Sequence, residues 1–480
     1  MKKAQIFYAD IGDYLTREQK LKIIRNTKSI ENLEMVELHP NKDGDWINLR
    51  NDEFAEYIPI FDREKSGVKT TYFNENSVGI VSSRDAWVYN FSMKKNIENV
   101  STLINFYNEQ VNLKEHNKIE SLSDDKKYIN WSVNLRKDAG KKIIHKVDES
   151  RFIENLYRPF CKYNVYYSKV LIERPSSWDK VFPGKKENIV ISLSNTGSTK
   201  EFSCLISDSI ADFQLMFNNQ CFPLYWYEEK KELENTLFDE FNKDKYIRHD
   251  GITDWILKQA RSIYGKSVEK EDIFYYVYGF LHSKEYRTKY AADLKKMLPR
   301  IPLVDKKEDF WAFSKAGRQL ANLHLHYETV EPISGLDVKF TGDMGNEYDY
   351  FSVEKLRFPS KDKKDTIIYN SHITISGIPE KAYEYIVNGK SAIEWIMDRY
   401  QVTVDKDSGI KNDCNDWAKE HKKPRYIYDL ILSIINVSCQ TVDIVNSLPK
   451  IDFGNNEKKE FVYPKIDENQ GLLMVARPED

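Results

Sequence analysis

The chain has 480 residues, of which 41% are hydrophobic and 31% are charged, and its formal net charge is −3. This length and apolar content predict two to four folded domains and exclude global disorder. The nearly balanced charge excludes a uniformly basic coat, so a contact with nucleic acid would have to use local patches.

Residues 1–65 are predicted to be the terminal piece of an α/β domain. Ala4–Ala9 (AQIFYA) has the composition of a buried strand, and a helix is expected soon after it. Thr16 and Gln19 stand at the spacing of a capping box, which marks the start of that helix. A strand followed by a helix is typical of α/β folds.

Residues 66–150 are predicted to connect this piece to the next domain. Val78–Tyr89 is predicted to form a strand, a turn and a second strand. Met93–Val111 is predicted to be an amphipathic helix, because apolar residues recur along it at helical spacing (Ile97, Val100, Ile104, Tyr107 and Val111). This stripe indicates a helix face that packs against a core.

Residues 151–300 form the first part of the next predicted domain and include the aromatic stretch Leu156–Pro183. Its pairs Arg158-Pro159 and Arg174-Pro175 restrict the backbone, and the residues between them predict a strand (Val165, Tyr166, Tyr167, Val170, Leu171 and Ile172). From Arg158 to Lys200 there are eight Lys or Arg and three Asp or Glu, a local charge of +5. Such a segment is typical of a nucleic-acid surface, although a solvated strand has the same composition.

A hairpin is predicted next, with the apolar runs 188–194 and 202–207 as its strands and 195–200 as its flexible polar tip. Asn and Lys in such a tip offer donors to bases or phosphates. The alternative is a solvent-exposed turn. The segment 225–245 is charged and aromatic and is interpreted as a connector.

Helices are predicted for most of the remaining chain. They cover 252–264, 272–298 with a break near His282, and 310–327. Residues 301–480 are the second part of the predicted domain and add a strand at 366–375, a helix capped by Ser391 and Glu394, and a long apolar helix at 426–448. The tail beyond Pro449 is expected to be loosely held.

Catalytic motifs are missing from the sequence. There is no N-P-P-Y loop for base methylation, and Gly265-Lys266-Ser267 and Gly389-Lys390-Ser391 match only the end of a phosphate-binding loop. His324 and His326 have no third metal ligand at a recognisable spacing. Five cysteines without a C-x-x-C pair, no signal peptide and no run of about eighteen apolar residues indicate a cytoplasmic protein without a membrane partner.

Three runs of sequence resemble one family of enzymes. Tyr157–Ile172, FPLYWYEE at 222–229 and Tyr276–Pro302 are similar to the target recognition domain of the Type ISP restriction-modification enzymes (the LlaBIII-like group). In these enzymes one polypeptide carries nuclease, translocase, adenine methyltransferase and specificity domain. The resemblance extends over nearly the whole chain, but Cys161 stands where the family usually has Asp after Arg-Pro-Phe.

This resemblance implies a fold and an organisation. The expected fold is α+β, with a mixed β-sheet target recognition domain, a helical connector and a helical C-terminal part. Residues 1–65 would be the last part of the methyltransferase domain, so Met1 is expected to begin a fragment or the product of a split gene.

The resemblance also implies a function: a DNA sequence-specificity module that positions double-stranded DNA for adenine N6 methylation and cleavage by domains absent from this chain. No catalytic or metal site is predicted, and S-adenosylmethionine, ATP and Mg²⁺ are expected only for the complete enzyme. The second expected partner is the methyltransferase and helicase-nuclease part of the same system. The residues predicted to contact DNA are Arg158, Lys162, Tyr166, Lys169, Arg174, Asn195 and Lys200.

Two other functions stay open on the sequence. The chain could be a subunit that docks a methyltransferase or translocase without touching DNA. It could also be a metal-dependent nuclease, because carboxylates near lysines, such as Asp179 beside Lys180, are frequent in it. Salt-dependent DNA binding would exclude the first alternative, and magnesium-dependent cleavage of plain duplex would favour the second.

Overall fold

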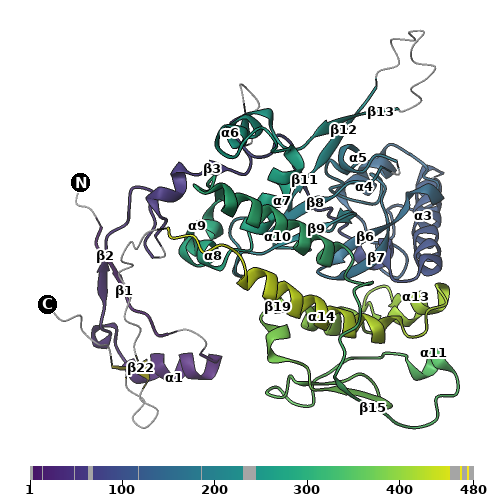
Figure 1. Cartoon of the computed structure of the whole chain (residues 1–480). Coiled ribbons are helices and arrows are strands. Elements are labelled where there is room, and N and C mark those ends of the chain that lie inside the picture. The colour runs from purple at the N-terminus through teal and green to yellow at the C-terminus, as the bar shows by residue number, and fades with distance from the viewer. Residues whose placement is uncertain are drawn as a thin grey trace. The chain divides into compact units, whose positions relative to one another are not determined.

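A computed structural model describes residues 4–12, 15–47, 49–62, 69–116, 118–184, 186–230 and 245–453, together with the backbone of 465–466 and 473–474. The chain divides into two compact units (Figure 1): unit 1 is Met1–Phe54 with Asp452–Asp480, and unit 2 is Ala55–Ile451. The predicted domain limits at residues 65, 150 and 300 stay a prediction.

Unit 1 contains a small antiparallel sheet and one α-helix. Strand β1 (Ile6–Tyr8) pairs with β2 (Val36–Leu38), which confirms a strand near the N-terminus. The prediction that this strand is buried was wrong, since Phe7 is exposed and no residue of β1 is buried. Helix α1 (Arg17–Thr27) begins at the predicted capping box, in which Thr16 and Gln19 each bond the other's backbone. No residue of α1 is buried, so its apolar side chains have no core of their own in the described part of unit 1. The unit also has the elements η1 (Ile30–Asn32), η2 (Asp52–Glu56, reaching into unit 2), β22 (Lys465–Ile466) and β23 (Leu473–Met474).

Two four-stranded sheets form the first half of unit 2. The order of the first sheet is β10-β6-β7-β5, with β10 and β6 parallel and the other pairs antiparallel. The order of the second sheet is β4-β11-β8-β9, all antiparallel. The strands are β4 (Ser77–Val78), β5 (Tyr89–Asn90), β6 (Phe152–Arg158), β7 (Cys161–Tyr166), β8 (Val190–Leu193), β9 (Cys204–Ser207), β10 (Ile210–Ala211) and β11 (Gln220–Pro223). The predicted hairpin around 195–200 is therefore confirmed as β8–β9.

Helices surround these sheets, and two of them cross at glycines. Helices α7 and α10 approach so closely that a Cβ at Gly317 would lie 1.9 Å from the Tyr275 carbonyl oxygen, and one at Gly279 would lie 2.2 Å from that of Phe313. The predicted break near His282 is confirmed, since α7 ends before it. The helices are α2 (Asp85–Val88), α3 (Met93–Glu115), α4 (Val133–Gly140), η3 (Glu149–Arg151), α5 (Trp178–Val181), α6 (Asp254–Tyr264), α7 (Lys270–Phe280), α8 (Lys284–Lys289), α9 (Ala291–Lys296) and α10 (Lys307–Leu325).

The C-terminal part of unit 2 contains a small sheet and four α-helices, and it packs against the first half. Its antiparallel sheet has the order β15-β17-β16, and Ser391 and Glu394 form the predicted capping box of α12. The elements are β15 (Asp337–Phe340), α11 (Glu347–Tyr350), β16 (Thr366–Ile368), β17 (Ile373–Ser376), η4 (Glu380–Tyr383), β18 (Ile386–Val387), β19 (Lys390–Ser391), α12 (Ala392–Arg399), β20 (Thr403–Val404), β21 (Lys411–Asn412), α13 (Cys414–Glu420) and α14 (Tyr426–Asn446). Helices, antiparallel sheets and one parallel pair confirm the predicted α+β class with a mixed sheet.

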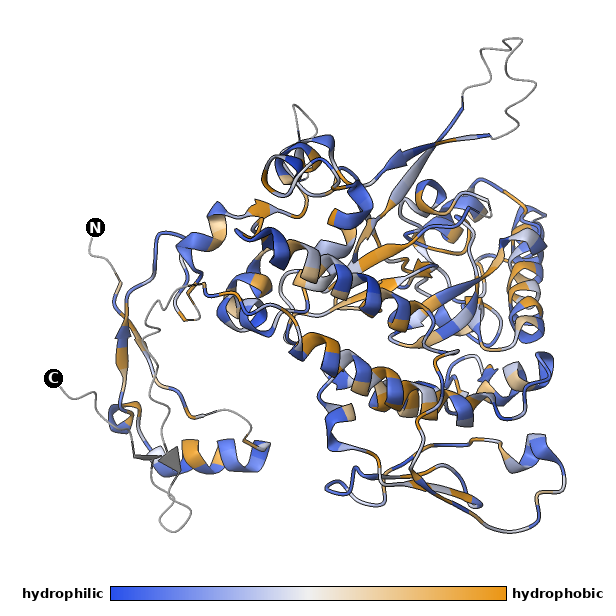
Figure 2. Cartoon of the chain, viewed as in Figure 1, coloured by the Kyte–Doolittle hydropathy of each residue, from blue (hydrophilic) through white to orange (hydrophobic). Residues whose placement is uncertain are grey.

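Helix α14 is the central helix of this part. Figure 2 shows apolar residues along it, and most of its first four turns are buried. Within the described residues, α14 is the one helix long and apolar enough to cross a membrane, and 67% of the relevant stretch is buried inside the fold. A mostly buried apolar helix is what the core of a large domain requires.

Several predicted elements differ from the structure. The single strand predicted at 366–375 is two antiparallel strands, β16 and β17. Val170–Ile172 is a turn, not a strand: β7 ends at Tyr166, and Leu171 and Ile172 are apolar because they are buried. Helix α2 occupies part of the predicted strand-turn-strand at 78–89. The predicted connector 225–245 begins as strand β12 (Tyr225–Glu229), which pairs with β13 (Tyr246–Asp250) in a ribbon; its residues 231–244, like most of the predicted loose tail, lie outside the described residues.

Candidate nucleic-acid interface

The Arg158-Pro159-Phe160 motif makes the tight turn between β6 and β7. Pro159 fixes φ at the first position of the turn. At the second position, Phe160 has a φ of +57°, a backbone conformation that residues other than glycine rarely adopt. Phe160 is fully buried, and its ring packs edge-on against Tyr327 at a centroid distance of 5.2 Å. The motif therefore anchors the first sheet to the end of α10.

Arg158 is held inside the protein. Its Nη1 donates to Asp212 Oδ1 at 2.6 Å, and its guanidinium carbon lies 3.9 Å from the centre of the Tyr157 ring. Tyr89 Oη donates to the other Asp212 oxygen at 3.0 Å. Burial raises the pKa of the Asp212 carboxyl to about 6, although Arg158 opposes that shift. The charge of Arg158 is therefore paired with a carboxylate of the same fold.

Lys162 and Tyr166 on β7 are also engaged within the protein. Lys162 Nζ lies 2.8 Å from a Glu328 carboxylate oxygen and 3.2 Å from one of Glu154. Tyr166 is 2% exposed, and its hydroxyl accepts a hydrogen bond from the Asp148 N–H. The structure thus places both side chains where they tie β7 to its neighbours.

Lys169 and Arg174 are exposed, and neither has a contact with Arg158 or Lys162 among the described residues. Lys169 forms an ion pair with Asp179 at 2.7 Å. The backbone of Arg174 bonds that of Val81 in both directions, and its side chain has no hydrogen bond or ion pair with a described residue. Lys169 and Arg174 therefore do not form one basic patch with Arg158 and Lys162.

Asn195 and Lys200 lie at the tip of the β8–β9 hairpin, which is fixed to its surroundings. The Gly197 N–H donates to the carbonyl of Lys295 on α9 at 2.7 Å, and the Asn195 N–H donates to that of Phe217 at 2.8 Å. The aliphatic part of Lys200 covers Gly389 in the β18–β19 turn, where a Cβ would lie 2.8 Å from Lys200 Cδ. The ammonium group of Lys200 is left on the exposed surface.

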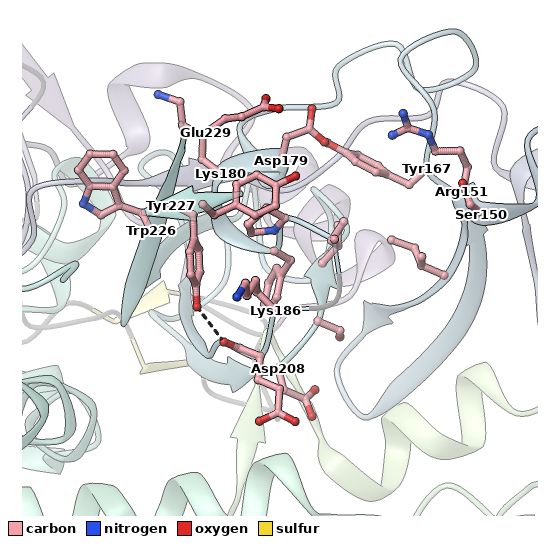
Figure 3. Close-up of a pocket in the computed structure, with 18 of the residues that line it drawn as sticks. Ser150, Arg151, Tyr167, Asp179, Lys180, Lys186, Asp208, Trp226, Tyr227 and Glu229 are labelled. Carbon is pink, nitrogen blue, oxygen red and sulfur yellow. Dashed lines mark hydrogen bonds between the residues drawn. The ribbon is translucent and has the colours of Figure 1, made fainter. Parts of the chain in front are cut away.

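A wide concavity of unit 2, here called the hairpin groove, lies near the opposite end of that hairpin (Figure 3). It has a volume of about 1180 Å³. Trp226 and Tyr227 of β12 form one side, and Arg151 and Tyr167 form the other. Tyr227 Oη donates to the Glu187 carbonyl at 3.3 Å. Lys169 lines this groove too, and Tyr166 lines a smaller cavity that shares Arg151, Lys169 and Asp179 with it.

The charges of the hairpin groove disfavour phosphate. It is lined by four cations against six carboxylates (Arg151, Lys169, Lys180 and Lys186; Glu154, Asp179, Glu187, Asp208, Glu228 and Glu229). Two of the cations are already paired, Lys169 with Asp179 and Arg151 with Asp148. A polyanion needs an excess of positive charge, so the hairpin groove is not the best candidate for contact with a DNA backbone.

A second surface, here called the cationic surface, has the required excess. Its three cations are Lys200 at the hairpin tip, Lys284 on α8 and Lys295 on α9. All three are exposed, and none has an ion pair with a described carboxylate; Lys284 instead donates to Asn446 Oδ1 at 2.7 Å. The sequence of α8 and α9, from 284 to 296, contains five Lys or Arg and two Asp or Glu.

The chain enters and leaves unit 2 beside this surface. Strand β3 (Ile58–Pro59), just after unit 2 begins, pairs with β14 (Arg300–Ile301), which follows α9, and Tyr57 Oη lies 2.9 Å from Tyr290 Oη. At the other end, the Asn446 side chain at the end of α14 contacts Lys284. Residues near both ends of unit 2 therefore contact α8 or the segment around α9.

His324, which was not expected to bind a metal, makes hydrogen bonds within the fold. His324 Nδ1 lies 2.6 Å from the Tyr278 hydroxyl, and its Nε2 lies 3.0 Å from Thr441 Oγ1. Burial lowers the pKa of His324 to about 3, so the ring is neutral. Among the described residues, no group of three or more His, Cys, Asp or Glu side chains is arranged to hold a metal ion.

Comparison with known proteins gives the family. A model of the Type ISP C-terminal specificity domain matches residues 71–430; no curated protein sequence matches. Among solved structures, a nuclease-deletion mutant of the Type ISP restriction-modification enzyme LlaGI, in complex with a DNA substrate mimic, is similar over 95% of this chain and 40% of its own, with 35% identity and a TM-score of 0.80. The ATP-dependent Type ISP enzyme LlaBIII bound to DNA is similar over 94% and 28%, with 36% identity and a TM-score of 0.81.

A third structure, the DrdV–DNA complex, is similar over 93% of this chain and 43% of its own, with 28% identity and a TM-score of 0.77. The chain spans less than half of each of these three structures. The chain belongs to the Type ISP C-terminal specificity domain family, as its sequence predicts.

Proposed function

We propose that this chain is the DNA target-recognition module of an enzyme of the Type ISP kind. It binds double-stranded DNA and positions it for adenine N6 methylation and cleavage, which other domains carry out. The observation that carries this proposal is the match of residues 71–430 to the specificity domain, together with the likeness to LlaGI, LlaBIII and DrdV structures that contain DNA or a DNA mimic.

Of the two surfaces described above, the cationic surface is better suited to contact the phosphates of DNA. Lys200, Lys284 and Lys295 are exposed and have no described carboxylate partner, so their charge is available to a polyanion. Phosphate contacts fix the register of a protein on DNA, while neighbouring polar side chains read the base edges. Asn195, at the base of the same hairpin tip, is placed to supply such a side chain.

The methyltransferase part of the same system is the second partner, and its binding site is on unit 1. Large apolar side chains of this unit are exposed: Phe7 by 55%, Ile24 by 60%, Ile30 by 70%, Val36 by 53% and Trp46 by 54%. So many exposed apolar residues in about fifty positions mark a surface that another chain or domain covers. Co-purification with a methyltransferase polypeptide of this family should therefore be lost when Ile24 and Ile30 are both changed to Asp.

In this proposal the module acts in the cytoplasm and has no chemistry of its own. S-adenosylmethionine, ATP and Mg²⁺ belong to the other domains. Magnesium-dependent cleavage of plain duplex by the purified chain would contradict this part of the proposal.

Selection from a random pool tests the recognition function. The full chain is incubated with random duplexes, and the bound fraction is sequenced. A recognition module enriches one short motif over the input pool, because each matched base pair adds about 1–3 kcal/mol of discrimination. Bound duplexes with the same composition as the input, or no bound duplex, would overturn the proposal.

A further inference from the structure

A pocket opens within the cationic surface, between α8, α9 and the end of α14. Its volume is about 500 Å³, which lies in the range of small-ligand sites. Side chains from separate parts of the sequence line it, among them Phe202, Lys284, Lys295, Tyr385, Ile386 and Val442. A concavity built by distant segments is formed by the fold and not by one flexible loop.

One wall of this α8–α9 pocket is apolar. Val442 and Val445 of α14 and Ile386 of β18 form it. Ile386 is 39% exposed although it is a large aliphatic residue in an ordered strand. An apolar wall inside a pocket with polar surroundings is a face against which the flat ring of a ligand can pack.

The pocket also has positively charged residues in its lining. Lys284, Arg287 and Lys295 line the pocket, against the two carboxylates of Glu201 and Glu384. Arg287 is held in place, because its Nε donates to the Leu281 carbonyl at 2.6 Å and its guanidinium carbon lies 5.7 Å from the Phe202 ring centre. Lys284 and Lys295 are the exposed cations suited to a phosphate group.

The floor has unused hydrogen-bonding capacity. Tyr385 is 6% exposed and lines the pocket, yet its hydroxyl has no hydrogen-bond partner in the described part of the chain. A buried polar group without a partner costs free energy. The hydroxyl is shielded from solvent, so a polar ligand atom gains a bond that the free protein lacks when the side chains around Tyr385 shift to admit it.

We infer that the α8–α9 pocket binds a single nucleotide, with its base against Ile386 and Val442 and its phosphate between Lys284 and Lys295. The inference deepens the proposed function and rests on it for one source of the ligand: a nucleotide extruded from bound DNA. Extrusion costs a few kcal/mol of unstacking, which a built pocket offsets. A free nucleotide has the same chemistry and is the other source.

Binding of nucleotides without DNA tests the pocket independently of DNA recognition. The full chain is titrated with each of the four deoxynucleoside 5′-monophosphates, and binding is followed by ligand-observed NMR. At least one should bind, and Ile386→Glu should weaken it by about tenfold or more, because it places a carboxylate against the base and near the phosphate. Ile263→Glu, a change at a similarly exposed isoleucine on α6, is the matched control and should leave binding unchanged.

Tyr385→Phe is the second variant, since it keeps the ring and removes only the hydroxyl. It should weaken nucleotide binding severalfold, and it should raise the unfolding midpoint or leave it in place, because it removes a buried hydroxyl that has no partner. If no nucleotide binds, or if neither Ile386→Glu nor Tyr385→Phe changes the affinity of one that does, the inference is wrong.

A competition experiment identifies the source and separates the two proposals. Displacement of the nucleotide by duplex supports extrusion from DNA, and retention of the nucleotide in the presence of bound duplex supports a free nucleotide; both support the pocket. Nucleotide binding by a chain that binds no duplex would overturn the proposed function alone. Duplex binding without any nucleotide binding would overturn the pocket alone.

Discussion

Arg158 and Asp212 form a 2.6 Å ion pair in which both side chains are mostly buried, 15% and 6% exposed. The pair joins β6 to the residue after β10. We predict that Arg158→Leu destabilises the protein by about 3–5 kcal/mol, because it leaves the Asp212 charge buried without its partner. Urea denaturation of the full chain measures this change.

Lys169→Leu is the control for that experiment. Lys169 and Asp179 also form an ion pair, but Lys169 is 70% exposed, and exposed pairs contribute at most about 1 kcal/mol. The stability should therefore hardly change. A variant Arg158→Leu that keeps full stability but loses DNA binding would instead identify Arg158 as a DNA contact.

The crossing of α7 and α10 depends on glycine. We predict that Gly317→Ala destabilises the protein by about 3 kcal/mol or more, since its Cβ would overlap the Tyr275 carbonyl and force the helices apart. Gly140→Ala is the matched change: it lies at the end of α4 with nothing within 4 Å of its Cβ, and alanine favours a helix by up to about 1 kcal/mol. A similar thermal midpoint for both variants would contradict the close crossing.

Acid should destabilise unit 2 through His324. Its pKa is lowered by burial to about 3 in the folded protein, against about 6.5 when unfolded. The unfolded chain therefore binds more protons between these values, so this contribution to stability is complete above about pH 6.5 and is lost as the pH falls towards 3. His324→Gln should reduce the slope of unfolding free energy against pH by about 1.4 kcal/mol per unit, and an unchanged slope would contradict a neutral buried ring.

The hairpin groove should not hold the DNA backbone. Changing Arg151, Lys169 and Lys180 together to Gln removes three of its four cations, and we predict less than about a twofold change in affinity for duplex, because six carboxylates already repel phosphate there. Fluorescence anisotropy with a labelled duplex measures this. A tenfold or greater loss of affinity for duplex would indicate that the DNA backbone binds in the hairpin groove and not on the cationic surface.

Local signals in the sequence predicted most of the elements. The capping boxes at Thr16 and Ser391 and the stripe of α3 depend on neighbours in sequence, and the structure has each of them. Val170–Ile172 was misread because burial in a turn selects the same apolar residues as a strand. A single sequence does not distinguish those two causes.

The candidate site was harder to predict, because charge in the sequence does not show which cations are already paired. Arg158 and Lys162 lie in a basic segment, yet their partners Asp212 and Glu328 are 54 and 166 residues away in the sequence. Lys284 was missed as a candidate, although the excess of Lys and Arg between 284 and 296 was a usable signal. Only the fold brings that helix pair beside Lys200.

The salt dependence of DNA binding tests the central claim most directly. Each phosphate contact contributes about 0.9 to the slope of log affinity against log salt concentration. Changing Lys200, Lys284 and Lys295 together to Gln should therefore reduce that slope by about 2–3 relative to the unmodified chain, while the triple variant of the hairpin groove keeps it. An unchanged slope in the first variant, or a salt-independent affinity of the unmodified chain, would contradict DNA binding by the cationic surface.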